Sequence, residues 1–471
     1  RGGPSDRPLA AKRATEEATV AVRANVHVSK DRAAFPHQEV TLAADPKTPG
    51  RLLAGSMINY EEGSHRARTV AYASDDGGRT WRLALDAKGH DFSGDPAAAF
   101  GPDGSAYFAR LRADKFEPGR PGGSSFLDLF RSADGGKTWA PPVALEGDYD
   151  RQYLAVDCTG GRFHGRVYCD AVLDVETLNG GPVPALALLA SRDGGRTYGR
   201  PVTRSVAPPA DQLITSNAVV LTDGTVVVLY HLPFGGVRAA VPEGKPIPKE
   251  VEADVLGVVV STDGGEMLTR PPGKPAAGRV ASLSATERGG VPVLAAAPAG
   301  EFKDRLYAVW GDCGPGDKPY TVLFAWSGDK GATWSAPVVL SEQPGGKGYD
   351  AFMPSVAVNK VGVVGVSWYD TRLVKGDEPS AAERGWDVRF RASLDGGRTW
   401  QPSVRVTETT TLFTEQMKRK APKDEHRYYH SPGETAGLAA DADGVFFPLW
   451  IDNRTGLRQV WTAAVTVDPK K

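Results

Sequence analysis

The chain has 471 residues, 41% of them hydrophobic, which is enough to bury a large core. Its 56 Lys and Arg residues nearly balance 57 Asp and Glu residues, and the net charge of −1 argues against a polybasic nucleic-acid surface or an acidic tail. The 55 Gly and 36 Pro residues are spread along the chain and favour a turn-rich β protein. No run approaches the ~18 apolar residues that a membrane span needs.

The first part of the chain, residues 1–24, is polar, and we expect it to be mobile and to lie outside the folded domain. Beyond it, a motif of the form S-x-D-x-G-x-T-W recurs. Its copies are SDDGGRTW (74–81), SADGGKTW (132–139), SRDGGRTY (191–198), STDGGEML (261–268), SGDKGATW (327–334) and SLDGGRTW (393–400). Each copy follows a β-branched or apolar run and precedes a short strand, as a hairpin turn does.

The composition of the motif explains its place in a turn. The Asp carboxylate can accept backbone N–H groups, Gly supplies positive φ, and Trp offers a flat face to the next unit. We therefore interpret these aspartates as structural. A second kind of hairpin, such as LTDGTVVVLYH (221–231), lies between the copies. Together the two kinds define a unit of four antiparallel strands.

This unit occurs seven times, and its last copy lacks the motif. Repeats of this length and strand content predict an all-β fold, a β-propeller of four-stranded antiparallel blades. Seven blades are favoured and six are the alternative. We expect residues 25–471 to form this single domain, with a strand around residues 26–28 helping to close the ring.

Candidate site residues gather where the last strand of one blade leads into the first strand of the next. This face lies opposite the Asp turns, which are the hairpin turns of the S-x-D-x-G-x-T-W motif. Asp95 lies in SGDP (93–96), where its carboxylate can act as an acid and base or cap a turn. Asp150 and Arg151 lie in YDRQY (149–153), which can recognise a sugar or bridge blades. Tyr349 and Asp350 occupy the same position in a later unit.

Two of the three cysteines, Cys158 and Cys169, flank the Gly-rich hairpin CTGGRFHGRVYC. If they lie across from each other on paired strands, a disulfide is possible and suits an exported protein. The alternative is two buried free thiols. With Cys313 the chain has three cysteines without paired CxxC spacing, which does not make a zinc site.

Two strand ends share a signature, WYDTR (368–372) and WIDNR (450–454). Arg372 and Arg454 can point to the axis and bind an anionic group through bidentate contacts. Alternatively, each arginine pairs with the aspartate of its own motif and stabilises the loop. The segment RYYHSPGE (427–434) is less repetitive, and Tyr429 near Glu434 can be an activated nucleophile or part of a solvated loop.

These features resemble the sialidase (neuraminidase) superfamily, and the chain is similar to bacterial exo-α-sialidase-like proteins with BNR or Asp-box repeats over about residues 25–467. The resemblance implies a glycoside hydrolase that uses an arginine triad, an aspartate acid/base and a tyrosine nucleophile assisted by glutamate. On this sequence the triad would be Arg110, Arg372 and Arg454. Asp95 would be the acid/base, and Tyr429 the nucleophile with Glu434 as its partner.

Two functions of different classes follow. The first is an exported glycoside hydrolase that acts on an acidic glycan, sialoside-like or uronate-like, at the loop face, with a glycan lyase as a variant. The second is a non-catalytic propeller that binds a glycan or protein partner, favoured by the repetition of W-x-D-x-R. We expect a periplasmic or extracellular monomer without cofactor, nucleic-acid partner or membrane span. Loop carboxylates can hold a structural calcium ion, although no loop has a recognisable ligand spacing.

Overall fold

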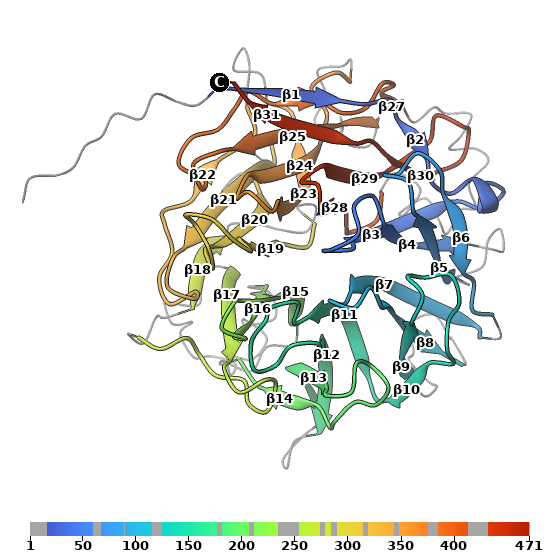
Figure 1. Cartoon of the computed structure of the whole chain (residues 1–471), viewed down its shortest axis with the longest axis vertical. Helices are drawn as coiled ribbons and strands as arrows, with labels where there is room; N and C mark the ends of the chain where they lie inside the picture. Colours follow the sequence, from blue (N-terminus) through green and yellow to red (C-terminus); the bar gives the residue numbers. More distant parts are fainter. Residues whose placement is uncertain are drawn as a thin grey trace, which may run out of the picture.

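A computed structural model describes residues 17–59, 67–88, 90–114, 125–176, 181–206, 212–233, 254–273, 278–283, 290–313, 319–342, 348–374, 385–412 and 432–470. The strands in these residues form seven antiparallel sheets around a central axis (Figure 1). The predicted seven-bladed β-propeller is therefore confirmed, and the six-bladed alternative is wrong. None of the described helices is both long enough and apolar enough to cross a membrane.

Within each of the first six blades the strands run outward from the axis in chain order. Blade 1 comprises β3 (His37–Ala44), β4 (Leu52–Asn59), β5 (Ala67–Ser74) and β6 (Arg82–Leu85). Blade 2 comprises β7 (Phe92–Phe100), β8 (Ala106–Ala113), β9 (Ser125–Ser132) and β10 (Val143–Glu146). Blade 3 comprises β11 (Tyr149–Val156), β12 (Val167–Glu176), β13 (Pro182–Ser191) and β14 (Val202–Arg204). Blade 4 comprises β15 (Ile214–Val220), β16 (Val226–Leu232), β17 (Asp254–Ser261) and β18 (Arg279–Leu283). Blade 5 comprises β19 (Val293–Ala296), β20 (Leu306–Asp312), β21 (Thr321–Ser327) and β22 (Val338–Val339).

Blade 6 comprises β23 (Ala351–Val358), β24 (Val364–Asp370), β25 (Gly385–Ser393) and β26 (Val404–Arg405), with β27 (Thr411–Leu412) also pairing with β25. Blade 7 comprises β28 (Gly437–Ala440), β29 (Phe446–Asp452) and β30 (Gln459–Thr462). The second strands of the blades are apolar runs covered on both faces by neighbouring blades, so nearly every residue of β24 and β29 is buried.

The last blade is completed by the N-terminal part of the chain. Strand β2 (Val26–His27) pairs with β30 as its outermost strand, which confirms the predicted closing strand. Strand β1 (Ala18–Val22) pairs with β31 (Val465–Pro469), and both lie at the rim of blade 7 (Figure 1). The boundary predicted at residue 24 is therefore wrong for residues 18–22, because their alternating Ala-Thr-Val-Ala-Val sequence adds a strand to the sheet. The 3₁₀ turn η1 (Lys30–Arg32) follows.

The predicted Asp turns have one repeated hydrogen-bond pattern. In blade 2, the Ser132 hydroxyl donates to Asp134 Oδ1 at 2.7 Å and accepts the Gly136 N–H at 2.8 Å. Asp134 Oδ1 also accepts the Thr138 N–H at 2.8 Å, and the Thr138 hydroxyl donates to Asp134 Oδ2 at 2.6 Å. These bonds, led by that of the Thr138 hydroxyl, hold the pKa of Asp134 below its ordinary value. Each carboxylate therefore serves its own turn and is structural.

The same turns tie neighbouring blades together on this face. Arg166 at the start of β12 donates to the carbonyl of Gly264, the first motif glycine of blade 4, at 2.5 Å. Equivalent contacts link blades 2 and 3 and blades 5 and 6. In blade 5 that glycine is replaced by Lys330, which keeps a positive φ of 59° and forms an ion pair with Asp223 of blade 4. Lys330 thus links blades 4 and 5 through its side chain.

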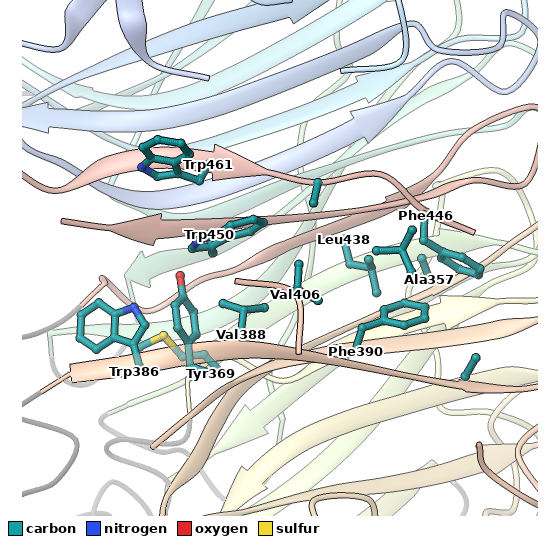
Figure 2. Close-up of a cluster of buried hydrophobic side chains, with 14 of the residues drawn as sticks. Ala357, Tyr369, Trp386, Val388, Phe390, Val406, Leu438, Phe446, Trp450 and Trp461 are labelled. Atoms are coloured by element: carbon teal, nitrogen blue, oxygen red, sulfur yellow. The ribbon is translucent and has the colours of Figure 1, made fainter. Parts of the chain in front are cut away.

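Apolar and aromatic side chains fill the spaces between blades. Figure 2 shows the cluster between blades 6 and 7, in which Trp386 and Tyr369 lie opposite Trp450. Two of the aromatic side chains form hydrogen bonds across this interface: Trp386 Nε1 donates to the carbonyl of Ile451 at 3.0 Å, and the Ile451 N–H donates to the Tyr369 hydroxyl at 2.9 Å. The aromatic rings therefore set both the spacing and the register of the two blades.

The predicted disulfide is not formed. Cys158 and Cys169 are both free thiols. Cys169 pairs with Leu154 across β11 and β12 and points into the core, whereas Cys158 lies beyond the end of β11 in the hairpin turn. The alternative of free thiols holds for both, although Cys158 is exposed and Cys169 is buried.

The motif of blade 4 offers a test of the turn chemistry. Met267 stands where other copies have Thr, so Asp263 receives the N–H of this residue and the Ser261 hydroxyl but no hydroxyl bond from position 267. We expect Met267→Thr to raise the free energy of unfolding by about 0.5–1 kcal/mol, since it adds the missing hydrogen bond at an exposed site. The reciprocal change Thr197→Met in blade 3 should lower it by a similar amount. Chemical denaturation measures both, and equal effects of the same sign would contradict the assignment.

Candidate active site

The innermost strands of five blades contain a β-bulge near their first residues. The ladder shifts register between Gln38 and Val40, Gly94 and Ala97, Asp150 and Tyr153, Thr215 and Ala218, and Phe352 and Ser355. Because the innermost strand of each blade starts at the face opposite the Asp turns, all five bulges lie at the same end of the axis. A bulge redirects the side chains of its strand, which places the bulged residues around the axial opening.

Four bulged residues other than glycine have left-handed backbone. The φ angles are 49° at Glu39, 53° at Asp95, 53° at Arg151 and 46° at Met353. Such a conformation costs on the order of 1–3 kcal/mol for a residue with a side chain. Its recurrence at one position of four blades shows that the ring holds it in place, and strained residues of this kind concentrate at functional sites.

Met353 lines an axial cavity of about 190 Å³, and Asp95 precedes Pro96, which also lines it. The walls come mainly from the innermost strands and include the apolar side chains of Pro96, Val293, Met353 and Pro354. Tyr153, next to the bulge of β11, and Glu434 also line it. The cavity therefore offers both apolar and polar surface to a small molecule.

The segment 432–434 crosses the mouth of this cavity and connects blades that are not neighbours. Its carbonyl at Pro432 accepts the Glu39 N–H of blade 1 at 3.1 Å, and the Glu434 carbonyl accepts the Val291 N–H before blade 5 at 3.1 Å. Between them, Gly433 has a φ of 103°, and a Cβ there would lie 2.6 Å from the Glu39 nitrogen. Only glycine permits so close an approach, which brings the Glu434 side chain to the axis.

Glu434 binds an arginine from the opposite side of the ring. Arg151 Nη1 of blade 3 lies 2.6 Å from Glu434 Oε2, and its Nε lies 3.8 Å from Asp150 Oδ2. The backbone N–H of Arg151 donates to Asp95 Oδ2 at 3.0 Å. Although burial lowers it, the charges of Glu434 and Asp150 raise the pKa of Arg151, so this guanidinium remains charged.

Asp95 lies beside two carboxyl groups whose pKa values are raised. Burial raises the pKa of Glu39 well above its ordinary value, and the charges of Asp95 and Glu434 and a hydrogen bond with Asp95 raise it further. The surrounding wall raises the pKa of Asp150 to about 7, assisted by the charge of Asp95, although 58% of the Asp150 side chain is exposed. Neighbouring carboxyls therefore share protons, an arrangement suited to general acid and base chemistry.

A second buried acid lies behind this group. Asp170 of β12 pairs with Tyr153 in the sheet register, is fully buried, and accepts the Thr215 hydroxyl at 2.9 Å. Burial raises its pKa to about 8. Burial also raises the pKa of Tyr153, so the hydroxyl of this cavity residue stays neutral and can donate a hydrogen bond.

Four of the site residues predicted from the sequence are therefore brought together: Asp95, Asp150, Arg151 and Glu434. Tyr429 lies outside the described residues. Tyr349 and Asp350 lie in blade 6, where the Tyr349 hydroxyl donates to the Glu342 carbonyl at 2.6 Å and Asp350 accepts the Tyr320 N–H at 2.9 Å. These two residues stabilise the entry to β23.

The predicted arginine triad is not formed by the described contacts. Arg110 is buried in blade 2 and binds Asp128, with Nη2 and Oδ2 2.9 Å apart. Each of the other two pairs within its own motif. Arg372 Nε lies 2.8 Å from Asp370 Oδ1, and Arg454 Nε lies 2.8 Å from Asp452 Oδ2. Neutralised guanidinium groups in three separate blades do not offer a common site for a substrate carboxylate.

Sequence reasoning assigned no role to Glu39 and Tyr153, although both lie near the start of an innermost strand, and it did not select Met353 and Asp170. For Met353, the following proline is a sequence feature that could have identified the bulge. Proline cannot donate to a sheet ladder, so Asp95-Pro96 and Met353-Pro354 inside apolar strand patterns mark bulges. No local signal identifies Asp170, because its neighbours come from another blade. Among the described residues, no group of three or more His, Cys, Asp or Glu side chains could hold a metal ion.

The chain was compared with known proteins. No protein-family model matches it, and no curated protein matches it. Similar solved structures include a protein of unknown function from Dyadobacter fermentans, with 13% identity, a TM-score of 0.47, and coverage of 96% of this chain and 99% of that one. A mutant of the NanB sialidase of Streptococcus pneumoniae has 11% identity, a TM-score of 0.44, and coverage of 91% and 68%.

The α-L-arabinofuranosidase Arb93A of Fusarium graminearum has 16% identity, a TM-score of 0.43, and coverage of 79% of this chain and 92% of that one. Likenesses this distant carry no inference about activity, so the function of the chain has to be inferred from its own residues.

The local role of the W-x-D-x-R arginines can be tested by substitution. We expect Arg454→Met to lower the free energy of unfolding by about 3–5 kcal/mol, because it leaves the buried Asp452 without its counter-charge. The double change Asp452→Asn with Arg454→Met should restore part of this loss. Urea denaturation measures the three variants. Full stability of Arg454→Met would contradict the assignment.

The buried Asp170 predicts a pH dependence of stability. Its pKa of about 8 in the folded state lies above that of an unfolded aspartate, so folding favours the protonated form and stability falls as pH rises towards 8. Asp170→Asn stays neutral and should lack this contribution, which amounts to as much as about 1.4 kcal/mol per pH unit. Thermal unfolding of both proteins between pH 5 and 9 checks it. Parallel curves would show that Asp170 is not held protonated.

Proposed function

We propose that this propeller is a glycoside hydrolase that acts at the mouth of its axial cavity. The observation that carries the proposal is the placement of Asp95 beside two carboxyl groups whose pKa values are raised, Glu39 and Asp150, next to a partly apolar pocket. Glycosidic bonds are commonly cleaved by a pair of carboxyls of which one is protonated and the other ionised. The resemblance to the sialidase superfamily is consistent with this class of reaction.

The geometry suggests a division of roles. Asp150 is exposed at the mouth, and its pKa of about 7 suits a general acid that protonates the leaving oxygen of the glycosidic bond. Asp95 is the partner carboxylate that assists attack at the anomeric carbon. Arg151 binds Glu434 and positions both Asp95, through its backbone N–H, and the segment that crosses the mouth. Glu39, whose pKa is raised, donates a hydrogen bond to Asp95 and so helps to hold it in place.

The acidic substrate expected from the sequence depended on three free arginines. Because Arg110, Arg372 and Arg454 are all paired, the proposal extends only to a glycan in general at this stage. Location outside the cytoplasm and the monomeric state remain predictions from the sequence. A propeller that binds the glycan without cleaving it is the alternative, and the activity test separates the two.

Substitution of the two carboxyls tests the proposed roles. We expect Asp95→Asn and Asp150→Asn each to lower kcat/KM on an aryl glycoside by about 10²–10⁴, the usual contribution of a general acid or base. Asp148→Asn is the matched control, since Asp148 is exposed two residues from Asp150 and its described bond is made by its backbone carbonyl. Activity is measured on a panel of nitrophenyl glycosides, with circular dichroism to confirm folding.

The pH profile provides an independent readout. If Asp150 donates the proton, kcat/KM should fall about tenfold per pH unit above pH 7, as the acid loses its proton. Unchanged turnover in both variants would reject these residues as catalytic. Binding of glycans without turnover of any glycoside would favour the non-catalytic alternative.

A further inference from the structure

The charges at the cavity mouth restrict the kind of sugar that can bind there. We propose that the site takes a sugar unit without negative charge, and that it excludes sialic and uronic acids. This inference rests on the proposed function for the place of binding. It differs from the expectation of an acidic glycan, which followed from the sequence alone.

Among the described residues at the mouth, no arginine is left unpaired to bind a substrate carboxylate. Arg151 reaches it, but its guanidinium is already paired with Glu434 at 2.6 Å and lies 3.8 Å from Asp150. The arginines of the predicted triad pair with aspartates in blades 2, 6 and 7. Recognition of a substrate carboxylate usually depends on a bidentate arginine contact, which none of these pairs leaves free.

Among the described residues, carboxyl groups outnumber cations at the same place. Four carboxyls, those of Glu39, Asp95, Asp150 and Glu434, face a single guanidinium, that of Arg151. Burial is the main cause of the raised pKa of Glu39 and of Asp150, and the charge of Asp95 raises both further, as expected where carboxyls lack sufficient counter-charge. A sugar carboxylate would add one more negative group to this site and would be repelled.

A neutral sugar matches the same surface. Its hydroxyl groups can donate to the rim carboxylates, and its C–H face can pack on Pro96, Met353 and Pro354. Tyr153 lines the cavity and presents a neutral hydroxyl. The cavity volume of about 190 Å³ equals that of about six water molecules in the liquid, which suits one sugar ring more than several.

Matched pairs of substrates test this inference. We expect a 4-nitrophenyl glucoside to have a kcat/KM at least tenfold above the glucuronide of the same anomer, and a galactoside to exceed the galacturonide likewise. The members of each pair differ only at C6, where a hydroxymethyl group replaces a carboxylate. Both anomers are tested. Equal or faster turnover of either uronide would overturn the proposal.

A charge variant adds a second readout. Glu434→Gln removes one negative group and releases Arg151, so the preference for the neutral member of a pair should shrink several-fold. Glu266→Gln is the matched control, because Glu266 pairs with Arg166 and Arg192 at the Asp-turn face of blade 4. It should leave the preference unchanged. An unchanged preference in Glu434→Gln would also count against the proposal.

The design separates this inference from the proposed function. If the wild-type chain cleaves no glycoside of the panel, the hydrolase proposal fails, and binding to an array of neutral and acidic glycans then decides the inference. Binding confined to neutral glycans supports it, and loss of this binding in Asp95→Asn locates it at the mouth. Binding of acidic glycans, or of no glycan, overturns it.

Discussion

The candidate site depends on a backbone constraint, the extra residue in the innermost strands of the propeller. Each bulge leaves residues out of the ladder at the end of the axis, and at Glu39, Asp95, Arg151 and Met353 the backbone is left-handed. The cost of these conformations is offset by the closed ring around them, whose blades pack through buried aromatic clusters and through the Asp turns. The stability of the rim thus makes the strained centre possible.

The carboxyl groups of this molecule are stabilised in two different ways. Away from the axis, buried aspartates such as Asp370 and Asp452 are each matched by an arginine two residues later, and the pairs stabilise loops. At the axis, the carboxyls of the described residues exceed the cations, and burial together with the neighbouring charges raises the pKa of Glu39 and of Asp150. The first arrangement is typical of structural ion pairs, and the second of sites that transfer protons. This contrast supports placing the chemistry at the mouth of the cavity.

Much of the fold was predictable because it depends on local chemistry. The S-x-D-x-G-x-T-W turns contain their own hydrogen-bond donors and acceptors, so their sequence identified six hairpins. The second kind of hairpin favoured seven blades. The position of Asp95, Asp150, Arg151 and Glu434 near the start of an innermost strand was enough to select them. The arginine triad is wrong, because Arg372 and Arg454 pair with the aspartates of their own W-x-D-x-R motifs, which was the alternative from the sequence.

By itself the sequence determined the β-propeller, favoured seven blades over six and predicted the face on which the candidate residues gather, because strand period and turn composition act over a few residues. Only the tertiary structure decided which groups meet at the axis. Glu39, Asp95, Arg151 and Glu434 are up to 395 residues apart in the chain and come from blades 1, 2 and 3 and the link before blade 7. The raised pKa of Glu39 depends on burial and on the nearby charges of Asp95 and Glu434, which are properties of the assembled ring and of no single segment.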